Sequence, residues 1–438
     1  MSGRMTLGSL FVLAALIPGI CRAQGGYGYA PPGGQPTPQQ YGYCPPPPAP
    51  SNTIYEQLPD DLGFLHEDSP LDRALTNVLR HSYYRAEYLL WSGTRPGNVN
   101  LGATPTSGFV PSTLASPIPP NTFNIPSNPI TGNPATAVLP SLGAFDVKNM
   151  NGFKGTIGLP IGPGAVELSA FVLGNRQNRF DGTSLITPEI PADLSSTPPI
   201  PIAIQGNFIG QPINVGGVQT FMVYDSGYQA IMKTGIYGGE ANYIFDAPNK
   251  GTGDLLTFSP LIGFRYLNYR ESLYQSGGYS FITDATTNPV TTSPEGRALY
   301  SQSNNNSYGA QFGVRAEATL SKVTFGAEPK IMLGLNSYTA SLSTINVPFD
   351  NPASNTSFNF HKSATTFSPI ADLRLYTRIN ISQRMNVYAA YNLMYVGSIS
   401  RPYDSIGYNI TAGGNGLFTP SFTDTIIQGL SVGGELQF

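Results

Sequence analysis

Charged residues that alternate with apolar ones are the side chains of this sequence with the clearest chemical potential. In residues 83–91, Arg85 and Glu87 fall on one side of an extended strand, and Tyr84 and Tyr88 fall on the other. A strand that crosses a membrane within a barrel needs this division, with polar groups toward the lumen and apolar groups toward lipid. The pattern recurs and gives these candidate lumen-lining residues: Arg85, Glu87, Glu167, Glu240, Arg265, Arg315, Glu317, Glu328, Lys330, Asp372, Arg374, Arg378 and Glu435.

Inward charges can have two roles, and the width of the barrel decides between them. In a wide barrel they line a water-filled pore and tune its ion selectivity. In a narrow barrel they form a network of ion pairs that fills the interior. About eight strands leave an interior just filled by side chains, whereas porins of about sixteen strands conduct freely. The sequence leaves both roles open.

Catalytic chemistry has little support in the sequence. An outer-membrane hydrolase needs a nucleophile within reach of a base, and the three histidines are His66, His81 and His361. His361 has Ser363 close by, which we interpret as chance. No histidine or cysteine spacing indicates zinc, and no glycine-rich phosphate loop lies between a strand and a helix. We therefore predict no enzyme activity, no metal site and no cofactor.

The amino-terminal end predicts export from the cytoplasm. Arg4 and the apolar residues 7–17 are typical of a secretory signal peptide, with cleavage expected after Ala23. A lipoprotein signal at Cys21 is the alternative. Cleavage would leave Cys44 as the single cysteine, which excludes an internal disulfide. Cys44 is either incidental or an intermolecular tether.

Four segments are predicted along the chain: a signal peptide (1–23), a disordered Pro/Gly/Tyr-rich tether (24–52), a periplasmic segment (53–81) and a barrel (82–438). The tether is too poor in apolar residues to bury a core. The periplasmic segment contains a short helix from Ser69 to about His81, with Ser69 as its N-cap. This helix could plug the barrel mouth or could be a simple packing element.

The composition leaves two classes of protein open. Charged residues make up 11% of the chain, against about 25% in ordinary soluble domains. The predicted mature chain has no run of about 20 apolar residues, so no helix is expected to span a bilayer. A secreted all-β protein and an outer-membrane barrel both fit. The net charge of −3 implies no nucleic-acid partner.

The final strand and the lengths of the connections favour the barrel. Residues 426–438 alternate strictly, and their apolar face resembles the terminal signal read by the barrel-assembly machinery: Leu430, Val432, Leu436 and Phe438. Short turns such as Ser321–Lys322 alternate with long loops, which separates a periplasmic rim from an outer rim. We predict an all-β fold: a transmembrane antiparallel up-and-down barrel of about ten strands (8–12), with long outer loops and short periplasmic turns.

Stretches without alternation are expected to be the outer loops, without clear structure of their own: residues 92–145, 175–217, 272–304, 337–363 and 397–423. Residues 218–245 are extended and rich in glycine. We interpret them as one long strand with a bulge or kink near 225–227, although a small hairpin is the alternative.

Several motifs resemble those of the BBP7 family (β-barrel porin 7) of planctomycete outer-membrane proteins. They are Tyr-Arg-Ala-Glu-Tyr-Leu-Leu-Trp at 84–91, Gly-Phe-Arg-Tyr-Leu-Asn at 263–268 with Glu-Ser-Leu at 271–273, Ala-Tyr-Asn-Leu-Met-Tyr at 390–395 followed by Arg401-Pro402, and the last strand. The likeness covers about residue 83 to the end, with the long loops unmatched. Ser92 and Val396 stand where the family commonly has tryptophan. The resemblance implies a porin.

Two functions from different classes follow. The first is a passive porin-like channel for small solutes or ions in the bacterial outer membrane. The alternative is a non-conducting structural or surface-anchoring barrel whose long loops bind partners or cell-wall material. The near-balanced inward charges favour a filled lumen, and the family resemblance favours a pore. The expected partners are the lipid bilayer, the barrel-assembly machinery and possible surface or cell-wall material.

Overall fold

The computed structural model describes residues 82–104, 110–111, 122–125, 135–187, 206–247, 255–284, 291–348, 355–410 and 416–438. The predicted signal peptide, tether and short helix lie outside the described residues. Among the helices of the described part, none is both long and apolar enough to cross a membrane.

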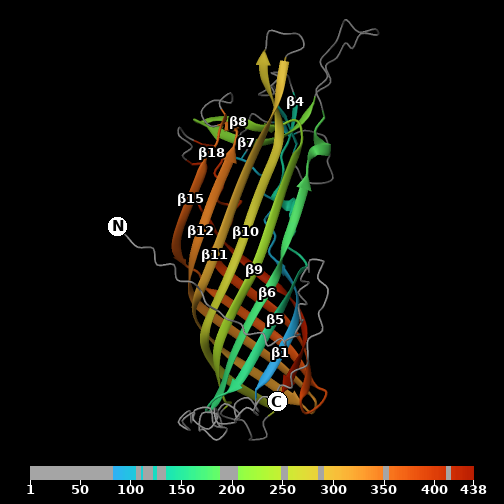
Figure 1. Cartoon of the computed structure of the whole chain (residues 1–438), viewed down its shortest axis with the longest axis vertical. Helices are drawn as coiled ribbons and strands as arrows, with labels where there is room; N and C mark the ends of the chain where they lie inside the picture. Colours follow the sequence, from blue (N-terminus) through green and yellow to red (C-terminus); the bar gives the residue numbers. More distant parts are fainter. Residues whose placement is uncertain are drawn as a thin grey trace, which may run out of the picture. The chain divides into compact units, whose positions relative to one another are not determined.

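Within the described residues, ten antiparallel strands close into a barrel (Figure 1). They are β1 (Tyr83–Gly93), β5 (Met150–Pro160), β6 (Gly164–Asp181), β9 (Tyr228–Phe245), β10 (Leu256–Asp284), β11 (Thr291–Leu320), β12 (Val323–Ile345), β16 (Ile370–Asn380), β17 (Met385–Ser400) and β19 (Phe422–Gln437). Each strand pairs with the next one in this order, and β19 pairs back with β1. The predicted antiparallel barrel of about ten strands is confirmed. Closure removes the free sheet edges that hydrocarbon would not tolerate.

A band of exposed apolar side chains surrounds the barrel and marks its membrane-spanning part. On β10 the outward face carries Leu256, Phe258, Ile262 and Phe264, all exposed, and ends with Tyr266. Beyond Tyr266 the outward residues turn polar. Ten residue steps of about 3.4 Å, along a strand tilted by about 40°, rise about 26 Å, which matches the lipid-facing band of outer-membrane barrels.

The last strand seals the barrel against the first. Tyr84 lies opposite Leu436, and the backbone N–H of Phe438 donates to the carbonyl of Ser82 at 3.1 Å. A Cβ at Gly433 would lie 1.9 Å from the backbone oxygen of Ala86, so only glycine fits this close approach. The predicted assembly-signal residues are all exposed: Leu430, Val432 and Leu436 on the outward face of β19, and Phe438 directly after it.

The short turns gather at the end of the barrel that holds the carboxyl terminus (Figure 1). Ser321–Lys322 joins β11 to β12 in two residues, with Ser321 at a φ of 55°. Residues 161–163 join β5 to β6, and Gly162 there has a φ of 62°. Both turns need the left-handed backbone that favours tight hairpins.

The expectation that the long connections lack structure was wrong for much of their length. The strands continue beyond the membrane band, so that β10 and β11 pair as far as Asp284 and Thr291. The upper strands have polar residues on their outward face, including Asn304, Asn306 and Ser337. Period-2 alternation of apolar residues disappears there, and the sequence signal for a strand disappears with it.

The connections also contain shorter elements. A six-stranded sheet, here called the cap sheet, consists of β2 (Val110–Pro111), β3 (Thr122–Ile125), β4 (Ala135–Val138), β7 (Asn207–Val215), β8 (Val218–Tyr224) and β18 (Asn409–Ile410). Two 3₁₀ turns, η2 (Leu142–Ala144) and η3 (Thr183–Leu185), accompany it. The strands β13 (Val347–Pro348) and β14 (Asn355–Thr356) form a small pair, and β15 (Asn359–Phe367) lies beside the upper part of β12.

The prediction of one long strand over residues 218–245 was wrong. The structure divides this stretch into β8, which pairs with β7 in the cap sheet, and β9, which belongs to the barrel. Gly216 and Gly217 close the β7–β8 hairpin with φ values of 58° and 86°, as a type I′ turn requires. Gly227, with a φ of 107°, forms the corner between the two sheets.

Candidate functional site in the barrel interior

The inward face of the lower barrel carries a layer of charged side chains. The structure places every sequence-predicted lumen residue on this face: Arg85, Glu87, Glu167, Glu240, Arg265, Arg315, Glu317, Glu328, Lys330, Asp372, Arg374, Arg378 and Glu435. Eight of them have no more than 6% of their surface exposed: Arg85, Glu87, Glu167, Arg265, Glu328, Lys330, Arg374 and Glu435. Buried charge at this depth requires partners.

Several ion pairs of this layer cross the lumen. Glu87 on β1 meets Arg374 on β16 at 2.6 Å, although β19 and β17 lie between these strands in the sheet. Glu167 on β6 meets Arg315 on β11 at 2.9 Å, with β9 and β10 between. Pairs between strands that are not neighbours form only where side chains meet near the barrel axis. The layer is therefore a filling of the lumen.

Four residues at the centre form a closed ring of contacts, here called the ion ring. Arg265 lies 2.9 Å from Glu240 and 2.5 Å from Asp372, and Lys330 lies 3.0 Å from Glu240 and 3.7 Å from Asp372. The ring joins β9, β10, β12 and β16. Lys154 on β5 also reaches Glu240, at 3.5 Å.

The ion ring continues into the rest of the layer. Lys330 contacts Glu328 at 3.0 Å, and Arg315 contacts Glu328 at 2.6 Å. Near the short-turn end Arg85 pairs with Glu435 at 2.6 Å, and its guanidinium lies 4.3 Å from the ring centre of Tyr388. Cation–π contacts of this kind add to ion pairing where water is excluded.

The charges of the layer balance. Its cations are Arg85, Lys154, Arg265, Arg315, Lys330, Arg374 and Arg378, and its anions are Glu87, Glu167, Glu240, Glu317, Glu328, Asp372 and Glu435. Seven of each sign give a net charge of zero. A balanced layer suits a buried network better than an ion-selective pore, whose lining carries an excess of one sign.

Sequence reasoning missed some members of this layer. Lys154 alternates with the exposed Phe153 and Ile157, so strand parity alone could have identified it as inward-facing. The inward-facing tyrosines were also missed. Tyr83 donates to Glu167, and Tyr376 donates to Glu317 at 2.6 Å. Strand parity could have identified them too, since Tyr83 has the parity of Arg85 and Tyr376 has the parity of Arg374.

Above the charged layer, apolar side chains fill the barrel. Connection residues here called the apolar cap belong to one buried cluster with inward-facing strand residues such as Leu89, Leu267 and Met332. The apolar cap consists of Leu101, Leu142, Phe145, Ile209, Ile213, Met222, Ile406, Ile410 and Leu417. Polar contacts also hold it, since Gln211 of β7 donates to the hydroxyl of Tyr228 at 3.2 Å.

A buried ion pair ties the segment after β17 into the upper barrel. Arg401 contacts Glu271 of β10 at 2.7 Å, and both side chains are almost fully buried. Ser301 of β11 donates to the carbonyl of Pro402 at 2.7 Å, and Asn305 donates to the carbonyl of Ser400 at 2.9 Å. Breaking such a pair would leave a buried charge without compensation.

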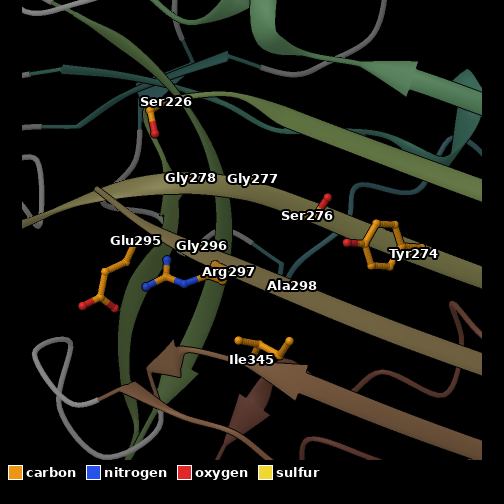
Figure 2. A pocket seen from close by; sticks show the side chains of 10 residues that line it. All are labelled: Ser226, Tyr274, Ser276, Gly277, Gly278, Glu295, Gly296, Arg297, Ala298 and Ile345. Carbon is orange, nitrogen blue, oxygen red and sulfur yellow. The ribbon is translucent and has the colours of Figure 1, made fainter. Parts of the chain in front are cut away.

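A groove of about 520 Å³ opens at the outer rim (Figure 2), between β10, β11, β12 and the β8–β9 corner. Its charged side chains hold the rim together. Glu295 accepts from the hydroxyl of Tyr279 at 2.9 Å, and Arg297 donates to the carbonyls of Asn346 and Val223 at 2.7 and 2.8 Å. In the part of the chain that the structure describes, no group of three or more His, Cys, Asp or Glu side chains is arranged for a metal.

The comparison with protein families agrees with this architecture. The sequence model of a family described as "Putative beta barrel porin-7 (BBP7)" matches residues 83–438. No curated protein matches the chain.

Among solved structures, the outer membrane protease OmpT from Escherichia coli is similar at a TM-score of 0.40 and 10% identity, over 82% of this chain and 97% of that one. The toluene transporter TodX of P. putida is similar at a TM-score of 0.22 and 8% identity, over 85% of this chain and 93% of that one. An anion-selective porin from Comamonas acidovorans is similar at a TM-score of 0.13 and 10% identity, over 82% of this chain and 98% of that one. The family match covers the whole barrel, and this chain belongs to the BBP7 family of outer-membrane β-barrels.

Proposed function

We propose that this protein is a closed outer-membrane barrel that anchors and presents its outer end, rather than an open pore. The observation that carries this proposal is the set of ion pairs across the lumen, such as Glu87–Arg374 at 2.6 Å and Glu167–Arg315 at 2.9 Å. A hydrated ion cannot pass between partners in direct contact. The apolar cap lies in series with this layer and forms a second barrier to water.

The outer end is then the part that serves function. The cap sheet and the upper parts of β10, β11 and β12 present a surface beyond the membrane band, including the groove at the rim. Rigid scaffolds that position variable connections are a common basis for binding. The proposal assigns no catalysis to the barrel, and this remains a prediction.

A passive porin-like channel is the second candidate, supported by the description of the family. Conduction would require the apolar cap to leave the upper barrel and the charged layer to rearrange. The cap is built from connections rather than barrel strands, which makes the first of these movements the easier one.

The accessibility of the lumen to a water-soluble reagent tests the proposal. Thr156 on β5 faces inward, is 2% exposed, and its hydroxyl has no hydrogen-bond partner in the described part of the chain. Thr156→Cys, in a Cys44→Ser background, is therefore a mild probe of the interior. We expect a charged methanethiosulfonate reagent to modify it about 100-fold more slowly than a cysteine in an exposed turn, since reaction must await local opening.

Ser382→Cys, in the exposed turn between β16 and β17, supplies the reference rate. Both variants must show the heat-shifted gel mobility of a folded barrel. A Thr156→Cys rate within about tenfold of the reference would indicate a water-filled lumen and favour the channel.

A further inference from the structure

Two cations lie on the outward face of the barrel just beyond the membrane band. Lys233 on β9 and Arg270 on β10 are both exposed. Their strands run in opposite directions, yet each cation stands four residues beyond a tyrosine at the band edge, Tyr237 on β9 and Tyr266 on β10. The rings of these tyrosines are 6.2 Å apart. Four residue steps along a tilted strand place both cations about 10 Å above the aromatic level, among lipid headgroups.

We propose that Lys233 and Arg270 bind the phosphate of an anionic lipid in the outer leaflet. The site goes beyond the proposed closure of the lumen and does not depend on it, because it lies on the exterior. The long-connection end of the barrel is taken as the outer one, as in outer-membrane barrels generally.

Strand register brings the two side chains together. Lys233 lies opposite Ser272 on β10, and Arg270 lies opposite Gly235 on β9. The two cations are thus diagonal neighbours on adjacent strands, a relation that puts Cβ atoms about 7–8 Å apart. Long Lys and Arg side chains span this gap readily. One phosphate group can therefore accept hydrogen bonds from both.

The local contacts leave both cations available. When the side-chain amide of Gln302 is turned so that its oxygen faces Arg270, this oxygen accepts hydrogen bonds from Nη2 and Nε of the guanidinium at 2.7 and 3.1 Å. This contact orients the guanidinium while leaving further N–H donors unused. Lys233 has no ion pair within the described residues. The nearby cation Arg179 of β6 is already paired with Asp181 at 3.2 Å, so we leave it out of the site.

Charge around the site favours an anion. The neighbouring outward positions carry Gln177, Gln229, Ile231, Ser272 and Tyr274. Asp181, which lies opposite Gln229, is acidic, and its charge is offset by its pair with Arg179. The charges of the lumen, in contrast, are balanced. An uncompensated cation pair held against a membrane surface attracts anionic headgroups, and each cation contributes about a five-fold gain in affinity.

Native mass spectrometry of the folded full chain in detergent, titrated with lipids, tests the proposal. The lipid probes are lipid A, phosphatidylglycerol and phosphatidylcholine. We expect the two anionic lipids to bind in preference to the zwitterionic one, and Lys233→Gln with Arg270→Gln to weaken that binding about 25-fold. Inorganic phosphate at millimolar concentration should not compete, because it gains nothing from insertion of acyl chains beside the apolar band.

The control is Arg95→Gln with Lys148→Gln, which removes two exposed cations near Asp146 at a different place on the outer end. This variant should bind lipid as the unchanged chain does. All four substituted residues are exposed, so heat-shifted mobility should persist in both variants. Equal binding of charged and zwitterionic lipids, or an unchanged affinity in the Lys233/Arg270 variant, would overturn the proposal. Effective competition by inorganic phosphate would overturn the assignment to a membrane lipid.

Discussion

Glu240→Ala is expected to lower the free energy of unfolding by about 3–5 kcal/mol, the usual cost of breaking a buried ion pair by removing one partner. Glu240 is the acceptor shared by Lys330 at 3.0 Å, Arg265 at 2.9 Å and Lys154 at 3.5 Å. Its removal leaves three buried cations with fewer anions than before. The single tryptophan, Trp91, is buried on β1 and reports unfolding by urea in lipid vesicles.

Asp146→Ala is the matched control, because its pairs with Arg95 and Lys148 are exposed. We expect a change of less than about 1 kcal/mol, typical of surface ion pairs. Glu240→Gln keeps one acceptor oxygen and should fall between the two. A Glu240→Ala protein as stable as the Asp146→Ala protein would mean that the charged layer is hydrated in solution.

Opening the barrel is expected to require the removal of both barriers. Replacing residues 402–421 by a short Gly/Ser linker removes Ile406, Ile410 and Leu417 from the apolar cap. Replacing the ion ring and the two pairs across the lumen by serine removes four charges of each sign, at Glu87, Glu167, Glu240, Asp372, Arg265, Arg315, Lys330 and Arg374. Each variant alone should show no channel in a planar bilayer. The combined variant should conduct in discrete steps, because two barriers in series both have to open.

The control for the combined variant pairs the linker replacement with Arg95→Ser and Asp146→Ser, a neutral removal of charge outside the lumen. It should remain silent. Discrete current steps from the linker variant alone would show that the charged layer does not block ion flow. Heat-shifted mobility establishes folding before each recording.

The inward direction of the charged residues followed from the sequence because lipid imposes a strict period of two. Arg374 lies between Leu373 and Leu375, and alternation of this kind leaves only one inward face. The ion-pair partner of each charged residue could not be predicted from the sequence. Glu87 and Arg374 are 287 residues apart, and their contact depends on how far each strand is displaced along its neighbours around the barrel.

The cap was less predictable, for a physical reason. Outside the membrane a strand no longer needs an apolar outward face, so upper strands rich in Asn and Ser look like loops. One signal was nevertheless present. Gly216 and Gly217 lie between the extended stretches that end at Val215 and begin at Val218, which is typical of a two-residue hairpin.

Closure of the lumen is the central claim, and single-channel recording of the unmodified protein tests it most directly. The chain from Gln24 onward, the predicted mature form, would be refolded, checked by heat-shifted mobility and inserted into a planar bilayer. The ion pairs across the lumen and the apolar cap predict a folded barrel that inserts without discrete current steps. Reproducible steps from the same preparation would contradict closure and establish a pore.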